Sequence, residues 1–233
     1  MSVSLNKFIS DTGLCSRREA DRWIEAGRVR MNGAQAQKGM RVTPDDEVIV
    51  DGRMLTKKSK AKRVYMALHK PAGVTCTTDQ RDPSNIIDYL DYPKRIFPIG
   101  RLDKASTGLL LLTNDGDIVN DILRVEKGKE KEYIVSVDRP VTKDFMAAMA
   151  GGLPILGTVT RQCEVEKVSK YVFRIVLTQG LNRQIRRMCE HLGYKVKSLH
   201  RVRIMHIEIG DLKPGKWRHL TQRELRTLLP TSR

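Results

Sequence analysis

The sequence lacks the features that mark secreted, membrane-spanning and zinc-binding proteins. Its four cysteines, Cys15, Cys76, Cys163 and Cys189, are widely scattered, and no pair has C-x-x-C spacing. The longest aliphatic run, at residues 109–112, is far too short to cross a bilayer. The N-terminus has no apolar stretch followed by a small-residue cleavage site. We therefore expect a cytoplasmic protein with reduced thiols and no membrane association.

Acidic residues are also in the minority. The chain of 233 residues carries 43 Lys and Arg against 27 Asp and Glu, which gives a formal net charge of +16. Such an excess indicates a polyanionic partner. An anionic membrane surface would attract the same charge, but no basic amphipathic helix stands out. Nucleic acid is therefore the preferred partner.

Residues 1–52 are expected to form a small module of two helices followed by strands. Apolar residues at helical spacing begin at Leu5, and Ser16 with Glu19 is typical of a capping box at the start of a second helix. Turn signals and strand-like segments follow, the last of them at residues 47–50. This pattern predicts a compact αα-plus-strands unit.

Residues 53–63 predict a basic linker, because they contain a run of lysines with almost no apolar content. The remainder, residues 64–233, alternates strand patterns with helical ones. The strand patterns lie at 64–68, 131–137 and 171–177, and the helical ones near 117–125, 142–149 and 182–192. We expect an α+β fold with a mixed, mostly antiparallel sheet in this second domain.

One carboxylate stands out in the second domain. Asp103 ends the run Gly100-Arg101-Leu102-Asp103, after an apolar, strand-like entry and between glycines. Such a loop can hold a charged group at the edge of a cleft. Taken alone, however, an aspartate in a loop is more commonly a turn residue or a helix cap.

The surrounding motifs resemble those of the RsuA family of pseudouridine synthases. Gly100–Asp103 is followed by Gly108-Leu109 and then by Thr-Asn-Asp-Gly at 113–116, as in the family signature. Three further segments match in order, at residues 68–73, 131–133 and 177–188. His69 stands where the family usually has Asn, and we interpret it as a hydrogen-bonded residue at a strand end. Within the family, residues 95–104 and 154–160 are most similar to the RluF branch.

The N-terminal module resembles the S4-like RNA-binding domain, named after a ribosomal protein. Its second predicted helix begins with Arg17 and Arg18, so two cations lie beside the unpaired N–H groups of the helix start. That combination suits a phosphate backbone. The alternative is that both arginines are solvated surface charges.

The resemblance implies an isomerase that converts a specific uridine to pseudouridine in 23S ribosomal RNA or the large ribosomal subunit precursor. A tRNA anticodon uridine is a second candidate substrate. The base is flipped out, detached from ribose, turned and rejoined through carbon, so we expect no cofactor and no metal, and we expect a monomer. Two alternatives remain: a non-catalytic RNA-binding or ribosome-assembly factor with the same fold, and another RNA enzyme such as a methyltransferase. The methyltransferase would need a cofactor-binding glycine loop, which is not visible.

The same resemblance assigns roles to three catalytic candidates. Asp103 matches the family's nucleophile, and Arg186 matches the buried arginine that pairs with it. Tyr133 matches the tyrosine that stacks on the target base, although it could be an ordinary strand aromatic.

Other residues are candidates for holding the RNA. Arg101 is expected to enter the space left by the flipped base, where a planar guanidinium can stack. Leu177 and Leu181 are expected to form the apolar wall of the pocket, with ordinary core packing as the alternative for Leu177. The remaining predicted RNA contacts in this domain are Arg183, Gln184 and Arg187.

Overall fold

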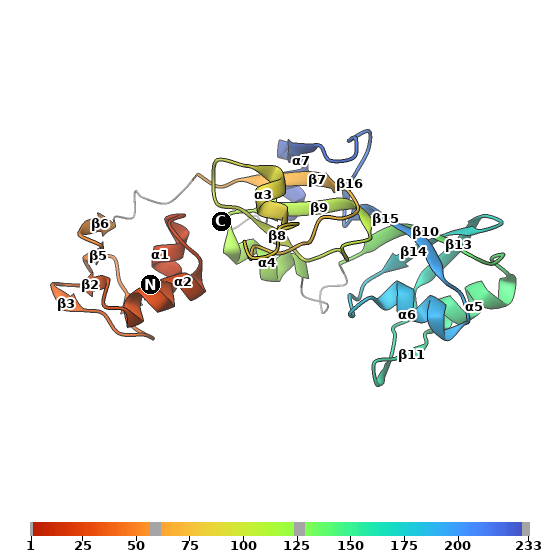
Figure 1. The fold of residues 1–233 in the computed structure, drawn as a ribbon, viewed down its shortest axis with the longest axis horizontal. Coiled ribbons are helices and arrows are strands. Elements are labelled where there is room, and N and C mark those ends of the chain that lie inside the picture. The colour runs from red at the N-terminus through yellow and green to blue at the C-terminus, as the bar shows by residue number, and fades with distance from the viewer. Residues whose placement is uncertain (1, 56–61, 124–128, 230–233) are drawn as a thin grey trace. The chain divides into compact units, whose positions relative to one another are not determined.

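A computed structural model describes residues 2–55, 62–123 and 129–229 (Figure 1). The chain forms two compact units. The first comprises Met1–Val64 with two short segments, Tyr92–Ile96 and Asn114–Gly116, and the second contains the rest of the chain. Each unit is described by itself.

The first unit combines two helices with short strands. The helices are α1 (Leu5–Asp11) and α2 (Arg17–Glu25). A four-stranded antiparallel sheet has the order β3 (Ala34–Gln35), β2 (Val29–Met31), β5 (Val48–Val50) and β6 (Arg53–Leu55). A separate pair joins β1 (Val3–Ser4) to β4 (Arg41–Val42). The apolar faces of both helices and of these strands share one core, as the predicted module requires.

The start of α2 confirms one half of the predicted capping box. The Ser16 hydroxyl accepts a hydrogen bond from the Glu19 backbone N–H at 3.0 Å. The reciprocal bond is absent from the described contacts of this cap, because the Glu19 carboxylate accepts instead from Trp23 Nε1 at 3.1 Å and Arg22 Nη1 at 2.9 Å. The reciprocal half of that prediction is therefore wrong.

The predicted linker begins too early. Residues Arg53–Leu55 form β6, which pairs with β5 in the register Val48↔Leu55. Leu55 is buried in the core of the first unit, and this burial explains why the segment is a strand despite its basic neighbours. Residues 56–61 of the predicted linker lie outside the described residues.

The second unit is built around a nine-stranded sheet (Figure 1). Its main order is β13 (Glu164–Ser169), β14 (Val172–Leu177), β10 (Lys131–Val137), β15 (Val196–Ile204), β9 (Thr107–Thr113), β7 (Tyr65–Lys70) and β17 (Trp217–His219). Two shorter strands extend it, with β16 (Ile207–Glu208) on β15 and β8 (Phe97–Ile99) on β9. The β15–β9 pair is parallel and the other pairs are antiparallel. The predicted mixed, mostly antiparallel sheet is confirmed.

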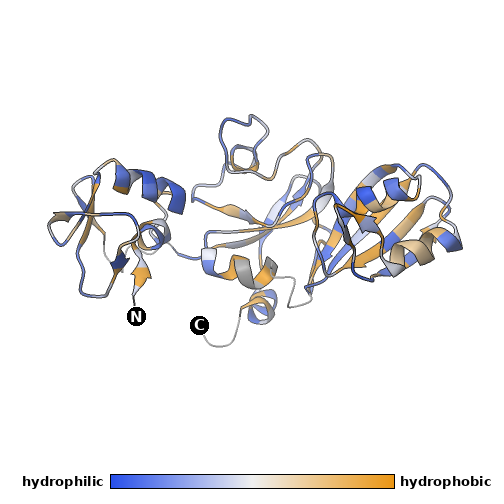
Figure 2. Ribbon diagram, turned by 90° about the horizontal axis from the view of Figure 1, so that it is seen from below, coloured by the Kyte–Doolittle hydropathy of each residue, from blue (hydrophilic) through white to orange (hydrophobic). Residues whose placement is uncertain are grey.

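The helices of this unit are α3 (Ile86–Leu90), α4 (Gly116–Leu123), α5 (Lys143–Gly151), α6 (Gln184–His191) and α7 (Gln222–Leu228), and a small hairpin joins β11 (Pro154–Ile155) to β12 (Thr158–Val159). Three of these helices, α4, α5 and α6, agree with the predicted positions to within a few residues, whereas α3 and α7 were not predicted. Figure 2 shows hydrophobic residues concentrated in the sheet, while the helices carry both hydrophobic and hydrophilic residues. Among the described residues, no helix is long and apolar enough to cross a membrane.

The parallel contact between β9 and β15 depends on one glycine. Gly108 has φ +109°, and a Cβ added there would lie 2.2 Å from the Arg201 carbonyl oxygen. Only a residue without a side chain permits this approach. As a result, the loop that precedes β9 reaches the centre of the sheet, next to β15 and one strand away from β10.

Candidate active site

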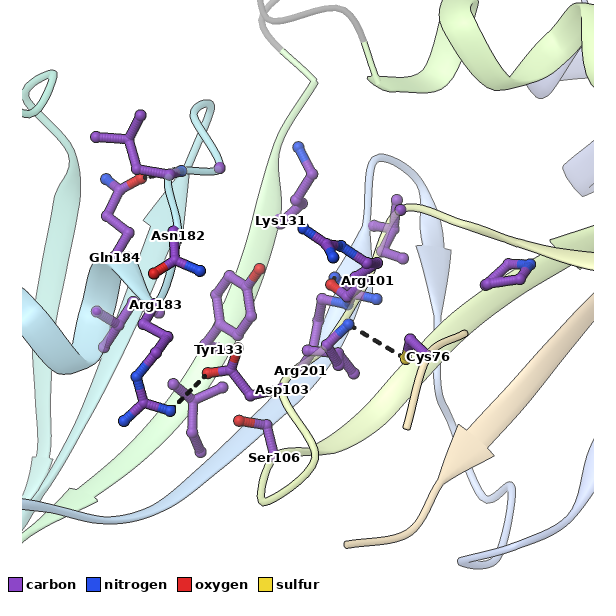
Figure 3. A pocket seen from close by; sticks show the side chains of 18 of the residues that line it. Cys76, Arg101, Asp103, Ser106, Lys131, Tyr133, Asn182, Arg183, Gln184 and Arg201 are labelled. Atoms are coloured by element: carbon purple, nitrogen blue, oxygen red, sulfur yellow. Dashed lines mark hydrogen bonds and ion pairs between the residues drawn. The ribbon is translucent and has the colours of Figure 1, made fainter. Parts of the chain in front are cut away.

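A cavity of about 930 Å³ opens beside this loop. Its lining combines the loop before β9, the start of β10, the segment that leads into α6, and part of β15 (Figure 3). Eight of the predicted site residues lie around it: Arg101, Asp103, Tyr133, Leu177, Leu181, Arg183, Gln184 and Arg186. Segments more than eighty residues apart in the chain therefore meet at one cavity.

The loop that carries Asp103 is held by its own backbone and by a neighbouring segment. The Ser106 N–H donates to the Asp103 carbonyl oxygen at 3.0 Å, and the Gly73 N–H donates to the Lys104 carbonyl oxygen at 2.8 Å. The Leu102 N–H points at the Cys76 sulfur, 3.4 Å away. These bonds fix the turn around Asp103.

A buried lysine ties the same loop to β7. Lys70 has no exposed surface, and its Nζ donates to the carbonyl oxygens of Pro71 at 2.7 Å, Ser106 at 2.8 Å and Lys104 at 3.3 Å. Burial lowers the pKa of Lys70. The sequence suggested no role for Lys70 beyond the match of residues 68–73, so its direct bonds to the aspartate loop were missed.

Asp103 faces two arginines of unequal burial. Its Oδ2 lies 3.5 Å from Arg186 Nε and 3.8 Å from Arg183 Nη1. The Arg186 side chain is 11% exposed and Arg183 is 46% exposed, so the first is the inner partner. Arg186 also donates from Nη2 to the buried Ser106 hydroxyl at 3.2 Å. The structure thus brings together the two residues predicted as nucleophile and partner.

Tyr133 and the two predicted wall leucines also line the cavity. Tyr133 is 9% exposed and lies in β10, between Ile175 of β14 and Arg201 of β15. Leu177 is buried at the end of β14, and Leu181 is half-buried just beyond it. A planar apolar group entering the cavity would meet these side chains.

Two residues predicted to contact RNA, Gln184 and Arg187, form hydrogen bonds with other groups of the protein instead. The Gln184 side chain is buried, and its Oε1 accepts from the Leu181 N–H at 3.0 Å. Arg187 does not line the cavity and binds Asn182 through two hydrogen bonds of 3.1 Å. Both residues shape the segment before α6, because their polar atoms are used there. A direct RNA contact by Gln184 is not favoured by this placement.

Three cations in the cavity were missed by sequence reasoning, namely Lys104, Lys131 and Arg201. Lys131 precedes Tyr133 by two residues in β10, and burial together with the charge of Arg201 lowers the pKa of Lys131. Arg201 is 3% exposed and donates from Nε to the Leu109 carbonyl oxygen at 2.7 Å. Lys131 could have been found from the sequence, because alternate residues of a strand point to the same face of the sheet. Lys131 and Tyr133 are two residues apart in β10 and therefore share a face.

The arginines predicted to dock RNA in the first unit are exposed. Arg17 and Arg18 open α2, immediately after the Ser16 cap. Both side chains therefore lie at the positive end of the helix, and their role in binding phosphate stays a prediction.

Comparisons with known proteins agree with this arrangement. The family model described as RNA pseudouridylate synthase matches residues 64–191, and the S4 domain model matches residues 3–48. The dual-specificity RNA pseudouridine synthase RluF of Escherichia coli K12 is 54% identical over 224 residues, covering 96% of this chain and 77% of that protein. Ribosomal large subunit pseudouridine synthase B of Bacillus subtilis is 32% identical over 233 residues, covering 96% of this chain and 94% of that protein. A crystal structure of a pseudouridylate synthase matches with a TM-score of 0.71 and 31% identity, covering 97% of this chain and 100% of the other.

Proposed function

The chain belongs to the RNA pseudouridylate synthase family, and we propose that its substrate is a uridine of 23S ribosomal RNA or of the large ribosomal subunit precursor. The predicted family and the RluF-like branch are confirmed, and the protein is an RNA pseudouridine synthase, an isomerase. One relative is named for the large ribosomal subunit and another for dual specificity. The first name supports ribosomal RNA as substrate, and the second supports a further RNA target, for which we propose a tRNA anticodon uridine.

The observation that carries the mechanism is the Asp103–Arg186 pair inside the cavity, beside Tyr133. A carboxylate that leaves water loses its charge unless a cation offsets the desolvation. Arg186 supplies that cation at 3.5 Å and is itself oriented by Ser106. The pair thus places a carboxylate nucleophile beside a fixed cation at the cavity.

The isomerisation exchanges one bond of ribose for another. The N1–C1′ bond breaks with its electron pair moving onto the uracil ring, while Asp103 either bonds to C1′ or removes the C2′ proton to give a glycal. The ring turns, C5 bonds to C1′, and Asp103 returns to its starting state. C5 loses one proton and N1 gains one, so atoms and electrons balance without a co-reactant. We propose that Tyr133 stacks on the ring during this turn and lies near the proton that leaves C5.

The target base must leave the RNA stack before it can reach Asp103. Arg101 is exposed at the cavity, and we propose that its guanidinium fills the space left by the base. Leu177 and Leu181 would then contact the uracil ring. Arg183 is proposed to bind an adjacent phosphate, because nearly half of its side chain is exposed.

Docking is assigned to the S4-like module. We propose that Arg17 and Arg18 bind the RNA backbone, and that the catalytic domain starts near residue 64, where the synthase match begins. The enzyme is proposed to act in the cytoplasm as a monomer.

A product assay tests this function. Purified protein without added cofactor is expected to form pseudouridine in a 23S ribosomal RNA fragment and in a tRNA anticodon stem-loop, detected by mass spectrometry of the digested RNA. Asp103→Asn is expected to bind the same RNA and form no product. Equal product from both proteins contradicts the mechanism. Tight binding without product from the wild type supports a non-catalytic RNA-binding factor instead.

A further inference from the structure

The charges around the cavity are strongly unbalanced. One carboxylate, that of Asp103, lies among six cationic side chains. These are Arg101, Lys104, Lys131, Arg183, Arg186 and Arg201. A single nucleophile needs one or two cations, so most of this charge has another purpose.

The six cations divide by burial. Arg101, Lys104 and Arg183 are exposed, so they can bind phosphates that remain hydrated at the surface. The other three, Lys131, Arg186 and Arg201, are half-buried or buried. A group that approaches these three must leave water, as a flipped base does and a phosphodiester does not.

Two of the three inner cations have no carboxylate partner among the described residues. Asp103 pairs with Arg186, whereas no described ion pair involves Lys131 or Arg201. Lys131 Nζ makes one described hydrogen bond, to the Lys129 carbonyl oxygen at 3.0 Å. The Arg201 Nη2 atom is buried and has no hydrogen-bond partner in the described part of the chain. Burying unpaired charge is costly, so a function is needed to explain it.

Both cations lie next to the tyrosine assigned to the base. Lys131 and Tyr133 are two residues apart on β10, so their side chains share one face of the sheet. Arg201 is the direct neighbour of Tyr133 on β15. Cross-strand neighbours of this kind have their Cβ atoms about 4.5–5.5 Å apart. Figure 3 shows the three side chains around the same part of the cavity.

We propose that Lys131 is a further catalytic residue, whose ammonium contacts the uracil ring and stabilises the negative charge that the ring carries while it is detached. This inference rests on the proposed function. When the N1–C1′ bond breaks, its electron pair spreads over N1 and the two carbonyl oxygens of uracil. The charge disappears when C5 bonds to C1′ and the proton balance is restored. A fixed cation in a water-poor site stabilises such transient charge far better than water does.

Arg201 is the second inner cation beside Tyr133, and backbone carbonyl oxygens hold it in place. Its Nε binds the Leu109 carbonyl oxygen at 2.7 Å and its Nη1 lies 3.5 Å from the Arg101 carbonyl oxygen, so its charge is fixed between β9 and the aspartate loop. From this fixed position, the Arg201 guanidinium adds positive electrostatic potential at the uracil ring.

The experiment compares Lys131→Gln with Lys131→Arg and with Lys143→Gln. Lys143 is an exposed residue of α5 outside the cavity, so its variant removes the same charge from the same unit. Single-turnover loss of the target nucleoside is measured with RNA that contains uridine or 5-fluorouridine at that position. The fluorine withdraws electrons and makes the detached ring a more stable anion, so the ring depends less on Lys131. RNA affinity is measured separately, and it also shows that each variant is folded.

Lys131→Gln is expected to slow the reaction of uridine about 100-fold, as removal of one preorganised charge-stabilising donor does. Its RNA affinity should match that of Lys143→Gln, and the loss should shrink several-fold with 5-fluorouridine. Lys131→Arg should recover much of the rate. An equal loss with both substrates, a loss confined to affinity, or no loss overturns the proposal. If the wild type itself forms no pseudouridine, the proposed function fails; if the wild type is active and only these comparisons fail, Lys131 alone is wrongly assigned.

Discussion

Lys70 Nζ lies 2.8 Å from the Ser106 carbonyl oxygen, three residues after the proposed nucleophile. The same ammonium binds two other carbonyl oxygens, so its three N–H donors are matched by three acceptors. A lysine without exposed surface is thus used to hold a loop, not to bind a ligand. This arrangement makes the geometry of Asp103 depend on a residue of β7.

Replacing this lysine should therefore affect both stability and catalysis. Lys70→Met keeps the approximate side-chain volume but removes the ammonium donor shared by three carbonyl oxygens, of which only that of Lys104 keeps a described donor, the Gly73 N–H. We therefore expect the free energy of unfolding to fall by about 2–4 kcal/mol. Urea unfolding measures this change, with the exposed Lys143→Met as control. The single-turnover rate should fall as well because Asp103 moves. Ordinary surface substitutions change the free energy of unfolding by about 0.5 kcal/mol or less. A change of only this size would show that Lys70 does not hold the loop.

The two arginines near Asp103 should differ sharply in importance. Arg186→Gln removes the partner that is 11% exposed and should reduce the single-turnover rate about 100-fold, because Asp103 loses the preorganised cation next to it. Arg183→Gln removes the 46% exposed partner at 3.8 Å and should change the rate only by a few-fold, as surface pairs contribute about 0–1 kcal/mol. Equal rates for the two variants would contradict the assignment of Arg186 as the inner partner.

The first unit should contribute affinity and not chemistry. The double variant Arg17→Gln, Arg18→Gln is expected to weaken RNA binding and to reduce the slope of log affinity against log salt by about 1–2, because each lost phosphate contact releases fewer counterions. The rate at saturating enzyme should stay unchanged. Arg22→Gln is the matched control, since this exposed arginine of the same helix is paired with Glu19. A slope identical to that of the control would exclude these arginines from the RNA interface.

Acid should weaken the contact between β17 and α7. Arg218 donates to both Glu224 oxygens at 2.7 and 2.8 Å, and this interaction holds the pKa of Glu224 at about 2, against an ordinary 4.5. Since the folded-state pKa is depressed, the pair contributes its full stability above pH 4.5 and loses it as the pH falls toward 2. Between pH 5 and 3 the wild type should lose about 1 kcal/mol more unfolding free energy than Glu224→Gln. The free energy of unfolding is measured by chemical denaturation at each pH. If it falls equally for the wild type and Glu224→Gln, the Arg218–Glu224 pair does not cause the loss of stability.

Much of the architecture could be predicted from the sequence because it depends on local patterns. The run 131–137 alternates its side chains and forms β10 with the same bounds, and the helical pattern near 142–149 forms α5, with Thr142 as its N-cap. The start of the linker was predicted too early, because the basic residue Arg53 made the short strand β6 resemble the charged segment that follows it. This strand is recognisable only from the burial of Leu55. The true capping box, at Thr221 and Glu224, was not identified from sequence.

The sequence by itself determined the family, through ordered motifs that name Asp103, Tyr133 and Arg186. Tertiary structure alone decided which charges meet around them. Lys70 and Arg201 reach the aspartate loop from strands on its two sides, and Gly108 allows the close approach that brings one of these strands there. Such contacts depend on strand order and burial, which a linear pattern does not specify. The sequence shows a basic protein with a candidate nucleophile, and the fold shows which cations are buried beside it without a carboxylate partner among the described residues.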